Sequence, residues 1–208
     1  MTPKEKMLLE SKAWALEKRS LDKTYFDRLS GVHSPDILWI GSIDSLVPVR
    51  ELINSDPGEV LVYRNMGVQV LEDDISLMAT IQDAVEVSNI KYIVVCGYSH
   101  CSGIKDVVLG SEDRPYVKTW LGDLRAMYEN RSEEFHDMDF EQRAKRLCEL
   151  NIRAQIIRLS QLDVIQKAWE KGNYPILLGW YFDLNTGALK EIFSMEASYK
   201  LKQVASVA

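Results

Sequence analysis

Two short segments of the chain carry side chains that could bind a metal ion or supply a nucleophile. The first is Gly41-Ser42-Ile43-Asp44-Ser45-Leu46, and the second is Cys96-Gly97-Tyr98-Ser99-His100-Cys101-Ser102-Gly103. Aspartate and cysteine are metal-ligand types, so Asp44 and Cys101 are the first candidates. Cys101 could instead be a nucleophile, activated by a nearby helix N-terminus and by Asp44 or His100 as a base. We therefore expect the chemistry of this protein at these two segments.

Each segment follows a short apolar run that reads as a β-strand. These runs are 37–40 and 92–95, and a third run covers 60–63. Helical stretches lie between them, which predicts a parallel sheet built from βαβ units and covered on both faces. In an open parallel sheet, ligands bind beyond the carboxyl ends of the strands. The loops at 41–48 and 97–103 are therefore expected to meet at one edge.

The two ends of the chain predict further elements. Thr2, Pro3 and Glu5 form a helix start with a capping box, and helical character continues to about Ser30. This arm could pack on a neighbouring subunit or on its own core. Near the other end, a strand over 175–183 turns at Asn185-Thr186-Gly187 into a strand over 188–193. Such a hairpin predicts an antiparallel last strand.

Residues 115–171 are predicted to be helical. Leu147, Leu150, Ala154 and Ile157 recur at spacings that predict one apolar helix face. Ser160 is expected to cap a further helix that stops at Gly172. The chain is thus interpreted as a single domain over 1–208, with a helical arm over 1–30 and an α/β core over 36–195.

Composition excludes several classes of protein. The 208 residues are 46% hydrophobic and 27% charged, with a net charge of −6 and no basic stripe, so no nucleic-acid partner is expected. The apolar runs fall short of the ~18–20 residues of a membrane span, and the charged N-terminal segment does not resemble a signal peptide. Three cysteines make no disulfide framework, which favours a cytoplasmic location.

Taken together, the two loops and several further blocks resemble the β-class carbonic anhydrases, close to the bacterial type. The further blocks are Pro57-Gly58-Glu59, Arg64-Asn65, Asn151 to Gln155, Gly179-Trp180-Tyr181 and Thr186-Gly187. The resemblance covers nearly the whole chain. It implies a central, mostly parallel sheet of four strands, an antiparallel C-terminal strand, flanking helices and a helical arm. It also implies a homodimer or a tetramer.

The same resemblance implies a zinc site that this chain has altered. The family holds zinc with two cysteines and one histidine, with aspartate or water in the fourth place. By position these ligands would be Ser42, Tyr98, Cys101 and Asp44. Serine and tyrosine hydroxyls are neutral at pH 7 and bind zinc poorly, so two competent ligands remain, Asp44 and Cys101. The arginine that orients the family's aspartate is replaced by Leu46.

These replacements bear on catalysis. Zinc lowers the pKa of bound water from 15.7 to about 7, which supplies hydroxide for attack on CO2. A shift of ~8 to 9 units is worth roughly 12 kcal/mol, whereas a hydroxyl hydrogen bond contributes about 0.5–1.5 kcal/mol. We expect no cofactor; a metal ion, if bound, would use Asp44 and Cys101. Cys96 and Cys148 are interpreted as structural thiols.

A separate anion site is also implied by the resemblance. Some bacterial members bind bicarbonate away from the zinc, and the matching residues here are Trp39, Arg64 and Tyr181. An arginine fork with indole and phenol donors suits a planar oxyanion. The alternative is that Trp39 and Tyr181 are core aromatics and that Arg64 pairs with an acid.

Three functions are therefore compared. The leading hypothesis is a catalytically degraded homologue, a pseudoenzyme that binds an anion such as bicarbonate or serves in assembly. The second is an enzyme that depends on Cys101 or on a metal-free polar pocket. The third is a working carbonate dehydratase with an atypical site, which the fold alone would suggest. It is ranked as the alternative because a fold does not fix a function. The sequence leaves open whether the chain is an enzyme.

Overall fold

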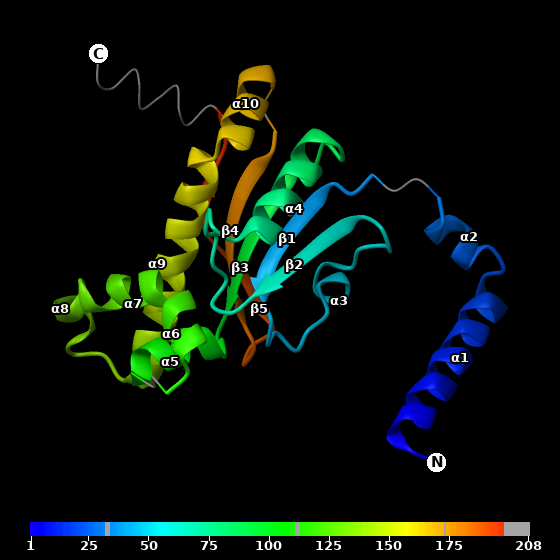
Figure 1. The fold of residues 1–208 in the computed structure, drawn as a ribbon, viewed down its shortest axis with the longest axis horizontal. Helices are drawn as coiled ribbons and strands as arrows, with labels where there is room; N and C mark the ends of the chain where they lie inside the picture. The colour runs from blue at the N-terminus through cyan, green and yellow to red at the C-terminus, as the bar shows by residue number, and fades with distance from the viewer. Residues whose placement is uncertain (32–33, 111–112, 173, 198–208) are drawn as a thin grey trace. The chain divides into compact units, whose positions relative to one another are not determined.

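The computed structural model describes residues 1–31, 34–110, 113–172 and 174–197. The chain divides into two compact units, Met1–Ser34 and Pro35–Ala208, which are treated separately below (Figure 1).

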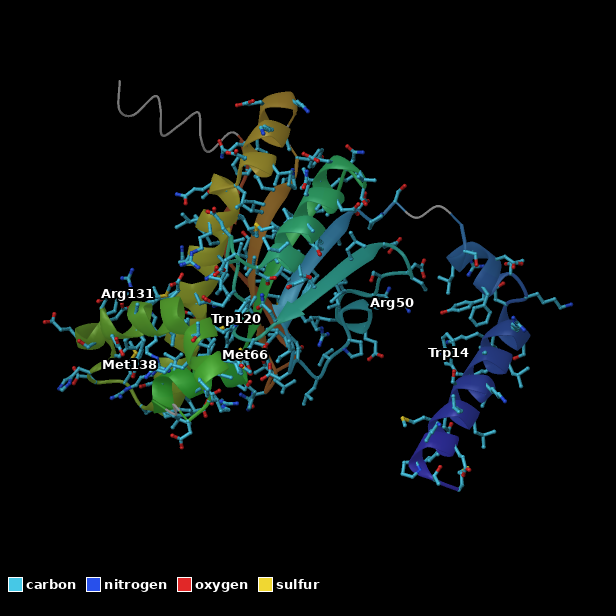
Figure 2. All side chains as sticks on the ribbon, viewed as in Figure 1. Trp14, Arg50, Met66, Trp120, Arg131 and Met138 are labelled. Carbon is cyan, nitrogen blue, oxygen red and sulfur yellow. The ribbon has the colours of Figure 1, made fainter. Side chains whose placement is uncertain are left out.

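The first unit contains two helices, α1 (Pro3–Leu21) and α2 (Tyr25–Leu29). The capping box at the start of α1 is present: Glu5 N–H donates to Thr2 Oγ1 at 3.2 Å, and Thr2 N–H donates to Glu5 Oε2 at 2.7 Å. Within this unit the rings of Trp14, Tyr25 and Phe26 pack edge to face (Figure 2). No residue of α1 is buried, so this helix keeps apolar side chains exposed.

The second unit is built on one five-stranded sheet. Its strands are β1 (Ile37–Ser42), β2 (Val60–Asn65), β3 (Tyr92–Tyr98), β4 (Ile176–Asp183) and β5 (Ala188–Met195), in the spatial order β2-β1-β3-β4-β5 (Figure 1). The first four strands are parallel, and β5 pairs antiparallel with β4 through a tight hairpin. The predicted mixed sheet is confirmed.

The remaining elements of this unit are helical. Their bounds are α3 (Val49–Ile53), α4 (Ile75–Glu86), α5 (Ser102–Leu109), α6 (Pro115–Trp120), α7 (Gly122–Glu129), α8 (Ser132–Phe135), α9 (Phe140–Gln161) and α10 (Asp163–Lys171). In the described ranges of the chain, no helix is both long and apolar enough to cross a membrane.

Helix α9 packs on the sheet through two glycines. A Cβ atom added at Gly97 would lie 2.4 Å from Cys148 Sγ, and one added at Gly179 would lie 2.6 Å from Ile152 Cγ2. Both distances are below any ordinary contact, so α9 approaches β3 and β4 more closely than side chains would permit. Helix α4 covers the same face of the sheet, since Leu77 and Ile81 share a core cluster with Leu38 and Ile40 of β1.

The predicted apolar face of α9 is only partly right: Leu147 is fully buried and Leu150 packs against the core. Ile157 is exposed, and Leu150 and Ala154 are only partly buried. The buried face instead includes two amides, Asn151 and Gln155. A search for apolar spacing passes over polar residues, although hydrogen bonds make their burial favourable.

Ser160 does not cap a helix, contrary to the prediction. It lies inside α9 and its hydroxyl donates to the carbonyl of Ile157 at 2.7 Å. Helix α10 starts after Leu162, which provides no side-chain cap. A serine can bond the preceding turn of its own helix, so its type alone does not mark a boundary.

The amides of α9 hold the loop after β2 in an unusual backbone conformation. Gly67 and Val68 have φ values of 74° and 54°, and a left-handed conformation is uncommon for a β-branched residue. Asn151 Nδ2 donates to the carbonyls of Gly67 and Val68 at 2.9 and 3.4 Å. Gln155 Oε1 accepts the N–H of Val70 at 2.9 Å. The loop is therefore fixed by buried hydrogen bonds from α9.

We expect Gly97→Ala to destabilise the protein by about 1–3 kcal/mol, because the new methyl group would overpack the contact with Cys148. Urea unfolding followed by circular dichroism would measure the change. Gly122→Ala is the matched control, since nothing lies within 4 Å of a Cβ added there. Equal stability of the two variants would contradict the close packing of α9.

Candidate active site

The two chemical segments meet at the carboxyl edge of the sheet, as expected. Strands β1 and β3 are neighbours and parallel, so the loops that follow them lie side by side. Ser42 ends β1 and Tyr98 ends β3, while Cys101 is the residue that precedes α5. The structure thus brings Ser42, Asp44, Tyr98 and Cys101 together from segments more than fifty residues apart.

The carboxylate of Asp44 lies at the centre of this group. Ser42 Oγ donates to Asp44 Oδ1 at 2.5 Å. The backbone N–H of Ser102, in the first turn of α5, donates to Asp44 Oδ2 at 2.7 Å. Both carboxylate oxygens therefore accept hydrogen bonds from the protein itself.

These bonds keep Asp44 ionised. Partial burial alone would raise the pKa of the carboxyl, but the hydrogen bonds from Ser102 and Ser42 outweigh it, and the net pKa lies below its usual value. Asp44 is consequently a carboxylate at neutral pH.

Tyr98, the residue that the resemblance places at the histidine position, directs its phenol to a backbone carbonyl. The hydroxyl donates to the main-chain carbonyl of Asp44 at 2.9 Å. Burial, followed by the nearby Asp44 carboxylate, raises the pKa of Tyr98 far above its usual value. The group therefore remains a neutral phenol that fastens the loop after β1 to the end of β3.

Cys101 is buried and protonated. The residue is 1% exposed, and its Sγ lies 3.4 Å from Ser42 Oγ. Burial raises the pKa of the thiol, and the Asp44 carboxylate raises it further, despite hydrogen bonds from Ser42 and from backbone N–H groups of α5. The N–H groups of the helix N-terminus do lower this pKa, as expected, but desolvation of the thiolate is the larger effect and the net pKa is raised.

Other candidate side chains near the site do not add a ligand. His100 is exposed, and its Nδ1 pairs with Ser99 Oγ at 2.9 Å. Cys96 is buried, and burial raises the pKa of its thiol to about 12. Leu46, which the resemblance places at the arginine position, is 79% exposed, and Asp44 is held by the hydrogen bonds from Ser42 and Ser102.

The residues present do not fit a zinc ion. Only Asp44 and Cys101 are strong ligand types, and zinc sites use three or four. Both carboxylate oxygens of Asp44 already accept hydrogen bonds from protein donors. Across the residues that the structure describes, no group of three or more His, Cys, Asp or Glu side chains could hold a metal ion.

The three residues of the expected anion site do not converge. Trp39 pairs in register with Val94, and Val94 pairs with Leu178, so these three share a face of the sheet. Tyr181 is three residues beyond Leu178 and points to the opposite face, toward α9. Phe182 takes the place on the Trp39 face and supplies no hydrogen-bond donor.

Trp39 and Arg64 do share a cavity, but a small one. It has a volume of about 10 Å³ and is also lined by Ser42, Tyr98 and Phe182. A water molecule needs about 10–15 Å³ by the same measure, so bicarbonate does not fit. Arg64 binds backbone here: its guanidinium donates to the carbonyls of Ser45 and Val47 at 2.7 and 3.4 Å.

Sequence reasoning missed two contributors. The Ser102 contact comes from backbone and has no side-chain signature, although a carboxylate opposite a helix start suggests such a bond. The position of Phe182 on the Trp39 face follows from the alternation of side chains along β4, because Leu178, Trp180 and Phe182 share one face once the register with β3 is known.

Comparisons with known proteins agree with this architecture. A family model described as carbonic anhydrase matches residues 37–189. A carbonic anhydrase of Emericella nidulans is 34% identical over 189 residues, which cover 90% of this chain and 82% of the relative. A carbonic anhydrase of Candida albicans is 30% identical and aligns with 80% of this chain and 59% of its own length.

Solved structures match as well. The Coccomyxa β-carbonic anhydrase, solved in complex with acetazolamide, superposes with a TM-score of 0.85 at 29% identity and covers 94% of this chain and 89% of its own. One of two tetrameric β-carbonic anhydrases from Sordaria macrospora gives a TM-score of 0.85 at 31% identity, with 92% and 98% covered. The family match over most of the chain and these superpositions agree: this chain belongs to the carbonic anhydrase family, in its β class.

Proposed function

We propose that this chain is a β-class carbonic anhydrase homologue whose zinc site has become a hydrogen-bonded structural element, and that it does not hydrate CO2. The observation that carries the proposal is the carboxylate of Asp44. Its two oxygens accept the Ser42 hydroxyl and the Ser102 N–H, within a set of side chains that offers only two zinc ligand types.

The remaining groups cannot replace a metal-bound hydroxide. Ser42 and Tyr98 present neutral hydroxyls, and the raised pKa of Tyr98 removes the phenolate as a base at neutral pH. Cys101 is buried as a thiol, which disfavours the alternative of a cysteine-dependent enzyme. A bicarbonate beside Trp39 and Arg64 would require the small cavity to enlarge, so we do not place one there.

We further propose a role in binding or assembly as a homodimer or tetramer. Helix α1 exposes apolar side chains that a partner subunit would cover, among them Leu9, Leu16 and Leu21. The related Sordaria macrospora enzymes are tetrameric. All three cysteines are free and buried, which suits a reducing compartment such as the cytoplasm.

The purified protein is expected to contain far less than one zinc per chain and to show no CO2 hydration above the uncatalysed rate. Elemental analysis and stopped-flow pH-indicator assays measure the two quantities. One tightly bound zinc per chain would refute the proposal.

The combined variant Ser42→Cys, Leu46→Arg and Tyr98→His is expected to gain about one zinc per chain, because it restores two ligands and the orienting guanidinium. The same variant with Cys101→Ser is the control and should lose the metal. A combined variant that folds but stays free of zinc would show that the pocket has changed beyond these three positions.

Asp44→Asn is expected to destabilise the protein by about 1–3 kcal/mol at pH 7, because an amide N–H would replace one acceptor and face a protein donor. The pKa of Asp44 is lowered by folding, so its contribution is present above the unfolded value of about 3.9 and is lost as pH falls through the folded pKa.

Urea titrations at pH 7 and pH 3 would therefore show a larger difference between wild type and Asp44→Asn at pH 7. Asp137→Asn is the control: Asp137 is exposed and has no hydrogen bond or ion pair in the part of the chain that the structure describes. A pH-independent difference for Asp44→Asn would mean that its ionised form does not stabilise the fold.

Replacing Leu9 and Leu16 of α1 together by glutamate is expected to lower the assembled mass, because charges would be buried in the subunit contact. Light scattering after size exclusion measures the mass. Ser11→Glu, at an exposed position on the opposite side of the same helix, should leave it unchanged. A monomeric wild-type protein would rule out the assembly role.

A further inference from the structure

An open depression adjoins the small cavity beside Trp39, and Val49 and Arg64 line both. The depression has a volume of about 660 Å³ and is bordered by α3, by the turn that follows α3, and by β2. This volume is within the range of small-molecule sites. Figure 2 marks Arg50 on α3, which contributes the second arginine of the depression.

Both arginines are held by backbone and not by acids. Arg64 donates to the carbonyls of Ser45 and Val47, and Arg50 Nε donates to the carbonyl of Ser55 at 3.3 Å. Within the described ranges, neither guanidinium has a carboxylate oxygen within ion-pair distance. A guanidinium carries five N–H donors, so each retains donors and an unneutralised charge.

Ser55 also lines this depression, but its hydroxyl is shielded from solvent and is therefore not a donor to a ligand bound there. Ser55 follows the left-handed residue Asn54, so the turn after α3 sets its position beside Arg50.

The charges around the depression narrow the ligand class. Glu51 and Asp56 also line it, so the two arginines and two acids give a lining with no net formal charge. Such a lining gives little long-range attraction, and recognition must come from directed hydrogen bonds. Arginine forks match the geometry of phosphate oxygens, whereas nearby carboxylates disfavour ligands with many charges.

We propose that the depression between Arg50 and Arg64 binds a single phosphate group, either free or as the monoester of a small molecule. None of the hydrogen bonds of the Asp44 network involves Arg50 or Arg64, although Arg64 also lines the small cavity with Ser42 and Tyr98. The proposal therefore holds or fails independently of the zinc content of the protein.

Isothermal titration of the full chain at low chloride with inorganic phosphate and with glycerol 3-phosphate tests the proposal and distinguishes the two sources. We expect one saturable site per chain, with pyrophosphate weaker than the preferred monophosphate. Tighter binding of glycerol 3-phosphate would identify an ester as the ligand, and tighter binding of inorganic phosphate would identify the free ion.

Arg50→Gln should weaken phosphate binding about tenfold or more, because a charge-assisted hydrogen bond is lost. Arg131→Gln, at an exposed arginine ahead of α8 (Figure 2), is the matched control and should bind as wild type. Arg64→Gln should also weaken binding, with a thermal melt to verify folding. Absence of saturable binding up to about 10 mM, or equal affinities of the Arg50 and Arg131 variants, would overturn the proposal.

Discussion

The carboxylate of Asp44 joins two parts of the chain that are 58 residues apart, the loop after β1 and the first turn of α5. Oδ1 accepts a hydrogen bond from Ser42 at the end of β1, and Oδ2 accepts one from the N–H of Ser102 in α5. Tyr98 adds a third connection by bonding the main chain of Asp44. Every member of this group bonds another, so hydrogen bonds hold the loop after β1, the end of β3 and the first turn of α5 together.

The position of α5 relative to Asp44 is determined by the loop after β2, on which α5 packs. A Cβ atom added at Gly103 would lie 2.8 Å from the backbone N of Gly67, so α5 rests directly on the loop after β2. That loop keeps its left-handed residues because Asn151 and Gln155 of α9 bond its backbone. Helix α9 in turn sits close to β3 through Gly97. The contacts thus run from the sheet through α9 and the loop to the N–H of Ser102.

Under the proposed function, this arrangement accounts for a family fold that persists while its zinc ligands change. Serine at position 42 is smaller than cysteine and donates a short hydrogen bond to Asp44, and tyrosine at position 98 reaches backbone. Both replacements put neutral hydroxyls where a metal site needs anionic or imidazole ligands. The scaffold, with TM-scores of 0.85 to β-class enzymes, carries no information about which donors occupy its edge.

The sequence by itself determined the sheet, the antiparallel last strand, the capped first helix and the meeting of the two loops, because apolar runs, turn residues and caps are local signals. It also carries the serine and tyrosine from which we propose that the zinc site is lost. Only the tertiary structure decided that the N–H of Ser102 bonds Asp44, that Tyr181 and Trp39 lie on opposite faces of the sheet, and that α9 buries two amide side chains. These depend on strand register, backbone donors and long-range partners, and residue types along the chain do not encode them individually.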